Sequence, residues 1–197
     1  MAISASEVKK LRDRTGLGMM DCKKALEEAG GNASKAEELL RKQGLKAAEM
    51  RVGRAATEGV VGSYIHTNNK IGVLVEINCE TDFAAGSADF KALVKDICMQ
   101  IAATSPKYVA PESAPSEEIA REKEIISAQC EGKPPHIVEK IVEGKLKDYY
   151  KQACLLEQPF IKETSQTVGE LVKGLNAKLG ENIVVRRFVR YEVGEEG

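Results

Sequence analysis

The sequence predicts an α+β protein in which a bundle of three short helices precedes a small antiparallel sheet, packed with helices, and a projecting helical hairpin. Two observations support this prediction. Strand-like patterns are confined to residues 60–78 and 183–193, whereas apolar residues elsewhere recur at spacings of three and four, as in amphipathic helices. Glycines and prolines divide the helical patterns into short segments.

Residues 1–45 predict the three-helix bundle, which we call the head. Ser4 and Glu7 fit a capping box at the start of the first helix. Each of the three helices is followed by a glycine, which commonly ends helices; these glycines are Gly16, Gly30 and Gly44. Residues 46–58 carry no sustained apolar stripe, so we interpret them as a linker that is helical in part.

Residues 59–197 predict the α+β core. Two strand-like runs flank residues 67–70, whose two asparagines tolerate the left-handed conformations of a hairpin turn. The clearest amphipathic pattern in the chain follows, in a helix that places Phe90, Leu93, Val94, Ile97 and Ile101 on one side. Thr167 and Glu170 fit a second capping box, which begins the helix before the last strand.

Two further segments complete the predicted core. Residues 116–156 predict a helical hairpin, because two helical patterns flank the break Gly132-Lys133-Pro134-Pro135. Its narrow apolar stripe and many charges indicate that it projects from the core. The last strand, 183–193, alternates so that one face is apolar except for Arg187.

Composition and charge narrow the possible functions. Hydrophobic residues make up 43% and charged residues 30% of the 197 residues, which suits a packed core with a well-solvated surface. The formal net charge is −1, so nothing indicates nucleic acid as a direct partner. The chain contains no apolar run of the ~18 residues that a membrane span needs, and it becomes polar by Ser4. We therefore expect a cytoplasmic protein without a membrane partner.

Residues that typically carry catalysis or bind metals are scarce. The five cysteines form no Cys-x-x-Cys pair, and their odd number favours reduced thiols. Neither His66 nor His136 has a second histidine or cysteine at metal-binding spacing. The motifs Gly-x-Ser-x-Gly, His-Glu-x-x-His and Gly-x-x-x-x-Gly-Lys-Ser/Thr are absent. We expect a protein that is not an enzyme and that has no cofactor or metal of its own.

The most informative stretch is Glu-Ile-Asn-Cys-Glu-Thr-Asp-Phe-Ala at residues 76–84, between the most strand-like segment and a helix. A phenylalanine at the tip of a strand-to-helix loop either folds back into its own core or is offered to a partner. The residues alone leave both alternatives open.

Two motifs resemble those of a known family. Residues 78–83, Asn-Cys-Glu-Thr-Asp-Phe, and residues 15–26, Thr-Gly-Leu-Gly-Met-Met-Asp-Cys-Lys-Lys-Ala-Leu, are similar to bacterial translation elongation factor Ts. The resemblance runs from about Ser4 to Gly194. It implies a head of the ubiquitin-associated type and a guanine-nucleotide exchange factor whose partner is elongation factor Tu.

The resemblance also implies which residues bind that partner. A loop would wedge into the GTPase domain of elongation factor Tu near its Mg²⁺ site, so that the metal loses its setting and GDP is released. The residues of this loop are Thr81, Asp82, Phe83 and Ala84.

The head would hold a helix of the same GTPase domain through Arg12, Met19 and Met20, and His66 would touch another partner domain. Each assignment has an alternative. The two methionines could instead fill the small bundle, because methionine adapts to irregular cores. The histidine could be a surface or packing residue of its strand.

Oligomeric state follows from a departure from the longer family pattern. Long members carry two copies of the hairpin-plus-helix core, whereas this chain has room for one. We therefore expect a homodimer that obtains the second copy from another subunit, with the edge of the last strand as a candidate seam.

An alternative from another functional class is a non-catalytic dimeric adaptor whose head binds a peptide or a protein. An adaptor has no need of an acid-aromatic loop on its core, so residues 81–84 favour the exchange factor.

Overall fold

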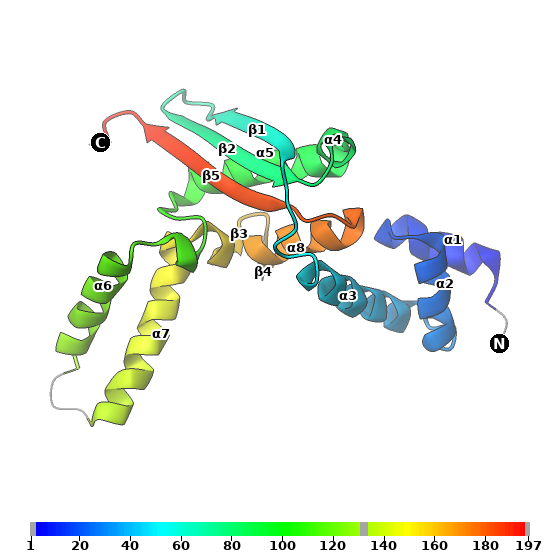
Figure 1. Cartoon of the computed structure of the whole chain (residues 1–197), viewed down its shortest axis with the longest axis horizontal. Helices are drawn as coiled ribbons and strands as arrows, with labels where there is room; N and C mark the ends of the chain where they lie inside the picture. The colour runs from blue at the N-terminus through cyan, green and yellow to red at the C-terminus, as the bar shows by residue number, and fades with distance from the viewer. Residues whose placement is uncertain (1–2, 131–133, 196–197) are drawn as a thin grey trace.

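The chain has two regions, each with its own hydrophobic core (Figure 1). The computed structural model describes residues 3–130 and 134–195. The N-terminal region is helical, and the second region combines a sheet with helices. The predicted α+β class is therefore confirmed. Among the described residues, no helix has the length and apolar character that crossing a bilayer requires.

The head is a bundle of three helices. They are α1 (Ala5–Thr15), α2 (Met19–Glu28) and α3 (Ala33–Glu49). The predicted capping box is confirmed, because the Ser4 amide donates to the Glu7 carboxylate at 2.8 Å and the Glu7 amide donates back to the Ser4 hydroxyl. The buried residues of the bundle are Val8, Leu11, Cys22, Ala25, Leu26, Ala36 and Leu40.

Helix α3 departs from the prediction that it ends at Gly44, since it continues to Glu49. The reason is tertiary contact. A Cβ atom built at Gly44 would lie 3.0 Å from the Cβ of Ala177 on α8 (Val168–Leu179), so the glycine allows two helices to approach closely. The first part of the predicted linker, 46–58, is helical, as expected, and α3 of the head lies against α8 of the core (Figure 1).

The sheet has three antiparallel strands in the order β1-β2-β5. They are β1 (Glu58–Ile65), β2 (Ile71–Cys79) and β5 (Val184–Glu192). Helix α5 (Ala88–Thr104) covers one face, and its predicted apolar residues are buried there against Val73, Val75 and Ile77 of β2. The predicted hairpin turn is confirmed, with Asn69 at a φ of 56°.

The predicted single apolar face of the last strand is wrong. Consecutive residues of β2 pair with Arg187 and Val185, so Arg186 is an extra residue that forms a β-bulge. One extra residue exchanges the two faces of a strand downstream of it. Phe188 therefore packs towards the core, and Val189, expected on the same face as Val185, lies on the open face of the sheet.

A helical hairpin, which we call the arm, projects away from both the sheet and the head (Figure 1). Its helices are α6 (Ser116–Ala128) and α7 (Pro135–Ala153). Glu118 anchors the base, because its carboxylate accepts hydrogen bonds from the hydroxyls of Tyr108 and Tyr149. The first helix of the arm was expected to run from about Ser116 to Glu131, and its last residue, together with the break residues Gly132 and Lys133, lies outside the described residues.

The segment between the arm and α8 forms a small hairpin that the sequence did not predict. It consists of β3 (Pro159–Phe160) and β4 (Glu163–Thr167), preceded by the short 3₁₀ helix η2 (Leu155–Glu157); a second 3₁₀ helix, η1 (Pro111–Ser113), precedes the arm. Buried Gln100 of α5 fixes the hairpin by donating to the Pro159 carbonyl and accepting from the Ile161 amide. The second capping box is confirmed, because Thr167 and Glu170 exchange hydrogen bonds at the start of α8.

Candidate functional site

The predicted wedge loop contains a short helix, α4 (Asp82–Gly86), between β2 and α5. Thr81 caps this helix, since its hydroxyl accepts a hydrogen bond from the Ala84 amide at 3.2 Å. Ala84 and Ala85 are buried against the core, with 4% and 8% of their surface exposed. The single helical turn therefore has a buried side made of alanines and an outer side that carries Asp82 and Phe83.

Phe83 is 87% exposed, the highest exposure among the large apolar residues of the described chain. Phenylalanine is normally a buried residue type, and burying its side chain is worth about 1.5–3 kcal/mol. The alternative in which Phe83 folds back into its own core is thus not the arrangement that the structure shows. A large apolar side chain that is exposed to solvent on a capped helix is accessible to a partner.

The backbone beneath α4 is fixed by a distant residue. Glu181, in the connection between α8 and β5, accepts hydrogen bonds from the amides of Glu80 and Thr81, each at 3.2 Å. On the inner side, the Cys79 thiol donates to the Thr81 carbonyl at 3.1 Å. Burial raises the pKa of the Cys79 thiol, so this cysteine acts as a neutral donor and not as a reactive thiolate.

The three head residues predicted to bind a partner, Arg12, Met19 and Met20, lie near the junction of α1 and α2, which we call the head junction. Met19 and Met20 begin α2 and are 44% and 62% exposed, so they do not fill the bundle. Arg12 is also exposed, one turn before the end of α1. All three side chains are therefore open to a partner.

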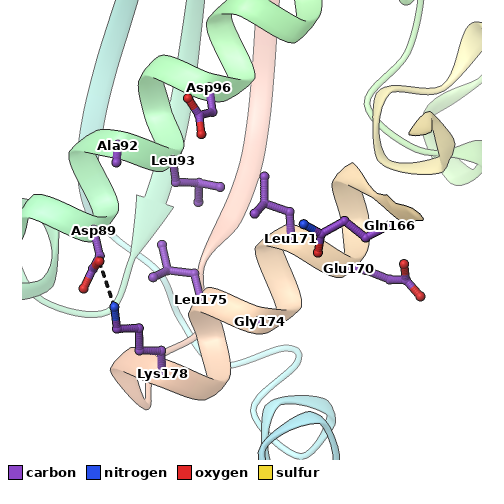
Figure 2. A pocket seen from close by; sticks show the side chains of 10 residues that line it. All are labelled: Asp89, Ala92, Leu93, Asp96, Gln166, Glu170, Leu171, Gly174, Leu175 and Lys178. Atoms are coloured by element: carbon purple, nitrogen blue, oxygen red, sulfur yellow. Dashed lines mark hydrogen bonds and ion pairs between the residues drawn. The ribbon is translucent and has the colours of Figure 1, made fainter. Parts of the chain in front are cut away.

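Lys178 connects the head with the region of the wedge. A Cβ atom built at Gly16, which ends α1, would meet the Lys178 side chain at 2.6 Å. The Lys178 ammonium also pairs with Asp89 in the first turn of α5 at 2.8 Å (Figure 2). Since α5 begins directly after α4, the head junction and the wedge lie on one side of the molecule, opposite the arm (Figure 1).

His66 lies apart from this group. It follows β1, whose first residue pairs with Cys79 beside the wedge and whose last residue pairs with Gly72 at the far end of the hairpin. The length of the strand separates His66 from the wedge by roughly 25 Å at about 3.3 Å per residue. The ring is half-buried, with its Nδ1 3.0 Å from the Tyr64 hydroxyl.

A groove of about 270 Å³ separates α5 from α8 (Figure 2). Leucines from both helices point into it, namely Leu93, Leu171 and Leu175. Its carboxylates Asp89 and Asp96 are paired with Lys178 and Lys162, at 2.8 and 2.6 Å. The Lys178 pair joins α8 to α5, whereas Lys162 joins the turn between β3 and β4 to α5. With both aspartates paired, the groove offers no pair of free carboxylates for acid–base chemistry.

Within residues 3–130 and 134–195, no group of three or more histidine, cysteine or acidic residues is arranged so that it could hold a metal ion. The features that stand out in the described chain are instead two places with exposed apolar side chains, Phe83 on α4 and Met19 with Met20 at the start of α2.

Comparison with known proteins identifies the family. The family model described as "Elongation factor TS" matches residues 18–195 of this chain. The chain belongs to the elongation factor Ts family.

The curated relatives of this chain agree with that assignment. Elongation factor Ts of Desulforamulus reducens is 60% identical over 195 residues, covering 98% of this chain and 90% of the relative. Elongation factor Ts of Moorella thermoacetica is 58% identical over 98% of this chain and 96% of the relative. Elongation factor Ts of Coprothermobacter proteolyticus is 56% identical over 99% of this chain and 100% of the relative.

Membership in the elongation factor Ts family makes this chain a translation elongation factor, with a role in protein biosynthesis. The matched range includes the wedge and most of the head junction, and it leaves Arg12 outside. The alignments cover 90% or more of this chain and of each of these relatives, so the relatives are of nearly the same length as this chain.

Sequence reasoning missed Glu181 as a residue of this site. It stands 100 residues after Thr81, and no local pattern links the two. The sequence offers little to indicate its role. Glu181 directly follows Gly180, which ends α8, and a polar residue is typical of any helix-to-strand connection.

Proposed function

We propose that this chain is the guanine-nucleotide exchange factor of elongation factor Tu, which it binds in the GDP-bound and nucleotide-free forms. The observation that carries the proposal is the exposure of Phe83, 87%, on a capped turn whose neighbouring alanines are buried. Family membership supplies the partner. We also propose that the protein works in the cytoplasm, where bacterial translation takes place.

In the proposed mechanism, residues 81–84 enter the GTPase domain of the partner next to its Mg²⁺. The metal belongs to elongation factor Tu, where it neutralises phosphate charge. Displacing the groups that position this ion weakens GDP binding, and GDP leaves. No covalent bond is made or broken, so the chain acts as an exchange factor and not as an enzyme.

Phe83 does not supply enough free energy to drive exchange alone. Seating one phenylalanine is worth about 1.5–3 kcal/mol, whereas shifting a two-state population by ~10⁴ requires about 5.5 kcal/mol. The head must therefore contribute binding energy through Arg12, Met19 and Met20. His66 would add a weaker contact to another partner domain.

Thermodynamic linkage makes the effects of the factor and the nucleotide on each other's binding reciprocal. If the factor weakens GDP binding to elongation factor Tu, GDP weakens binding of the factor by the same ratio. The same reciprocity holds for GTP, so GTP binding releases the factor and completes the cycle.

We further propose that two copies of the chain associate through the open face of the sheet, the face not covered by α5. Exposed apolar residues gather there on all three strands, at Val61, Ile65, Leu74, Val189 and Tyr191. None of the described elements covers them (Figure 1). Strand β5 is an edge strand as expected, but its apolar residues after the bulge point to the face, which favours face-to-face packing over an edge seam.

Release of a fluorescent GDP analogue from elongation factor Tu tests the proposed function. We expect a catalytic amount of this protein to accelerate release by orders of magnitude over the spontaneous rate. Tight binding to elongation factor Tu without any acceleration would favour the adaptor alternative, and absence of binding would contradict both the partner and the mechanism.

A further inference from the structure

We propose that Glu181 is the positioning residue of the exchange site: its carboxylate fixes the orientation in which α4 presents Phe83. This inference rests on the proposed function, because Phe83 is the group that is positioned. Glu181 itself lies in the connection between α8 and β5 and is half-buried.

The contacts of the carboxylate reach the first turn of α4 through the backbone. One oxygen accepts from the amides of Glu80 and Thr81, each at 3.2 Å. The other accepts from the Thr81 hydroxyl, which in turn accepts from the Ala84 amide. Hydrogen bonds to a carboxylate are stronger than those between neutral groups. A single charged group therefore holds both the strand end and the helix cap.

The connection between α8 and β5 is in turn held by residues next to the wedge. The Glu80 carboxylate accepts from the Asn182 amide at 2.7 Å. The Asn182 side-chain amide donates to the carbonyl of Arg54 at 2.9 Å, and the Arg54 guanidinium lies 3.7 Å from Glu80. The wedge, the connection after α8 and the segment that enters β1 thus share one network.

Helix α4 needs such an anchor because of its length. It has five residues, fewer than an isolated helix needs to be stable in water. Its outer side makes few contacts, since Phe83 is 87% exposed. Ala84 and Ala85 hold the inner side of the helix against the core, and Glu181 holds its N-terminal cap next to Phe83. Without the carboxylate, the cap samples other conformations and the partner must order it on binding, which slows exchange.

The test compares Glu181→Ala and Glu181→Gln with a matched control, Glu163→Ala. Glu163 is an exposed carboxylate whose hydrogen bonds stay within β4, so its removal leaves the wedge untouched. Glutamine keeps an oxygen that accepts from the two amides, and alanine keeps none. Each variant is first measured without elongation factor Tu, by fluorine NMR of protein labelled with 4-fluorophenylalanine.

The label gives four signals, one for each phenylalanine, and Phe83→Leu identifies the signal of the wedge. We expect Glu181→Ala to broaden or shift the Phe83 signal, with the signals of buried Phe90 and Phe160 unchanged. We expect the Glu80 and Thr81 amides to exchange with solvent at least tenfold faster. Glu181→Gln should recover most of the wild-type signal, and Glu163→Ala should match wild type.

GDP release from elongation factor Tu is then measured with the same proteins. We expect Glu181→Ala to slow catalysed release about tenfold, Glu181→Gln to recover much of the rate, and Glu163→Ala to equal wild type. Unchanged fluorine signals and amide exchange in a folded Glu181→Ala would overturn the positioning role, as would a wild-type release rate. If the wild-type protein does not accelerate release at all, the proposed function fails, while the fluorine and amide data still decide whether Glu181 positions Phe83.

Discussion

At the scale of single residues, two phenylalanines in neighbouring helices show how position decides role. Phe83 of α4 is 87% exposed, and Phe90 of α5 is fully buried in the core beneath the sheet. The two residues are seven positions apart and chemically identical. Their difference arises because Thr81 and Ser87 begin two separate helices, each with its own buried side.

This difference in burial predicts that the two truncations differ in their effect on the free energy of unfolding. Phe83→Ala should leave the free energy of unfolding nearly unchanged, because the side chain has little burial to lose. Phe90→Ala should lower it by about 3–5 kcal/mol through the cavity left in the core. Urea unfolding followed by circular dichroism checks both. A loss of more than about 2 kcal/mol in Phe83→Ala would mean that Phe83 packs into its own core in solution.

At the scale of helices and strands, local signals were predictable from the sequence and tertiary ones were not. The capping boxes at Ser4 and Thr167 were found because each needs only residues three apart. Gly44 was misinterpreted as a helix end because its role, close approach to Ala177, depends on a helix far along the chain. The bulge at Arg186 has no signal in an alternating strand, so one residue reversed the predicted face.

The same distinction applies to the candidate site. Residues 81–84 were located through the family motif, whereas the exposure of Phe83 required the structure. The polar hairpin of β3 and β4 was missed because it lacks apolar alternation. Glu181 was missed because its contacts with residues 80 and 81 span about half of the chain.

The base of the arm gives a prediction on pH at the scale of elements. Hydrogen bonds from Tyr108, and then from Tyr149, hold the pKa of the Glu118 carboxyl below its usual value. The same bond raises the pKa of Tyr108 to about 12. Because the folded-state pKa of Glu118 is lowered, its stabilising contribution is present above the ordinary glutamate pKa and is lost as pH falls through the folded-state value.

Thermal unfolding of wild type and Glu118→Gln checks this. We expect the wild type to melt at a higher temperature at pH 7, and the difference to shrink as the pH is lowered below about 4. A difference that stays constant down to pH 3 would show that the Glu118 charge does not hold the arm.

At the scale of the whole molecule, the open sheet face predicts self-association. Its apolar residues are exposed on all three strands, with Ile65 at 63% and Tyr191 at 71%. Light scattering at micromolar concentration should give twice the chain mass, and addition of elongation factor Tu should give a two-to-two complex. We expect Tyr191→Glu to be monomeric, because a buried unpaired charge opposes association.

The matched control is Val52→Glu, which places the same charge at a residue that is 71% exposed and belongs to the connection between α3 and β1, outside the strands of the sheet. This variant should remain dimeric. A wild-type monomer that still catalyses exchange would contradict the dimer and show that one core copy suffices, and a dimeric Tyr191→Glu would place the seam elsewhere.

The most direct test of the central claim, that Phe83 promotes exchange, is the rate of fluorescent GDP release from elongation factor Tu with wild type and Phe83→Ala at equal concentration. We expect Phe83→Ala to be roughly 10- to 100-fold slower, since it loses about 1.5–3 kcal/mol of wedge contact. Ile125→Ala, which truncates a 47% exposed side chain on the arm, is the control and should match wild type. A folded Phe83→Ala that releases GDP as fast as wild type would contradict the account.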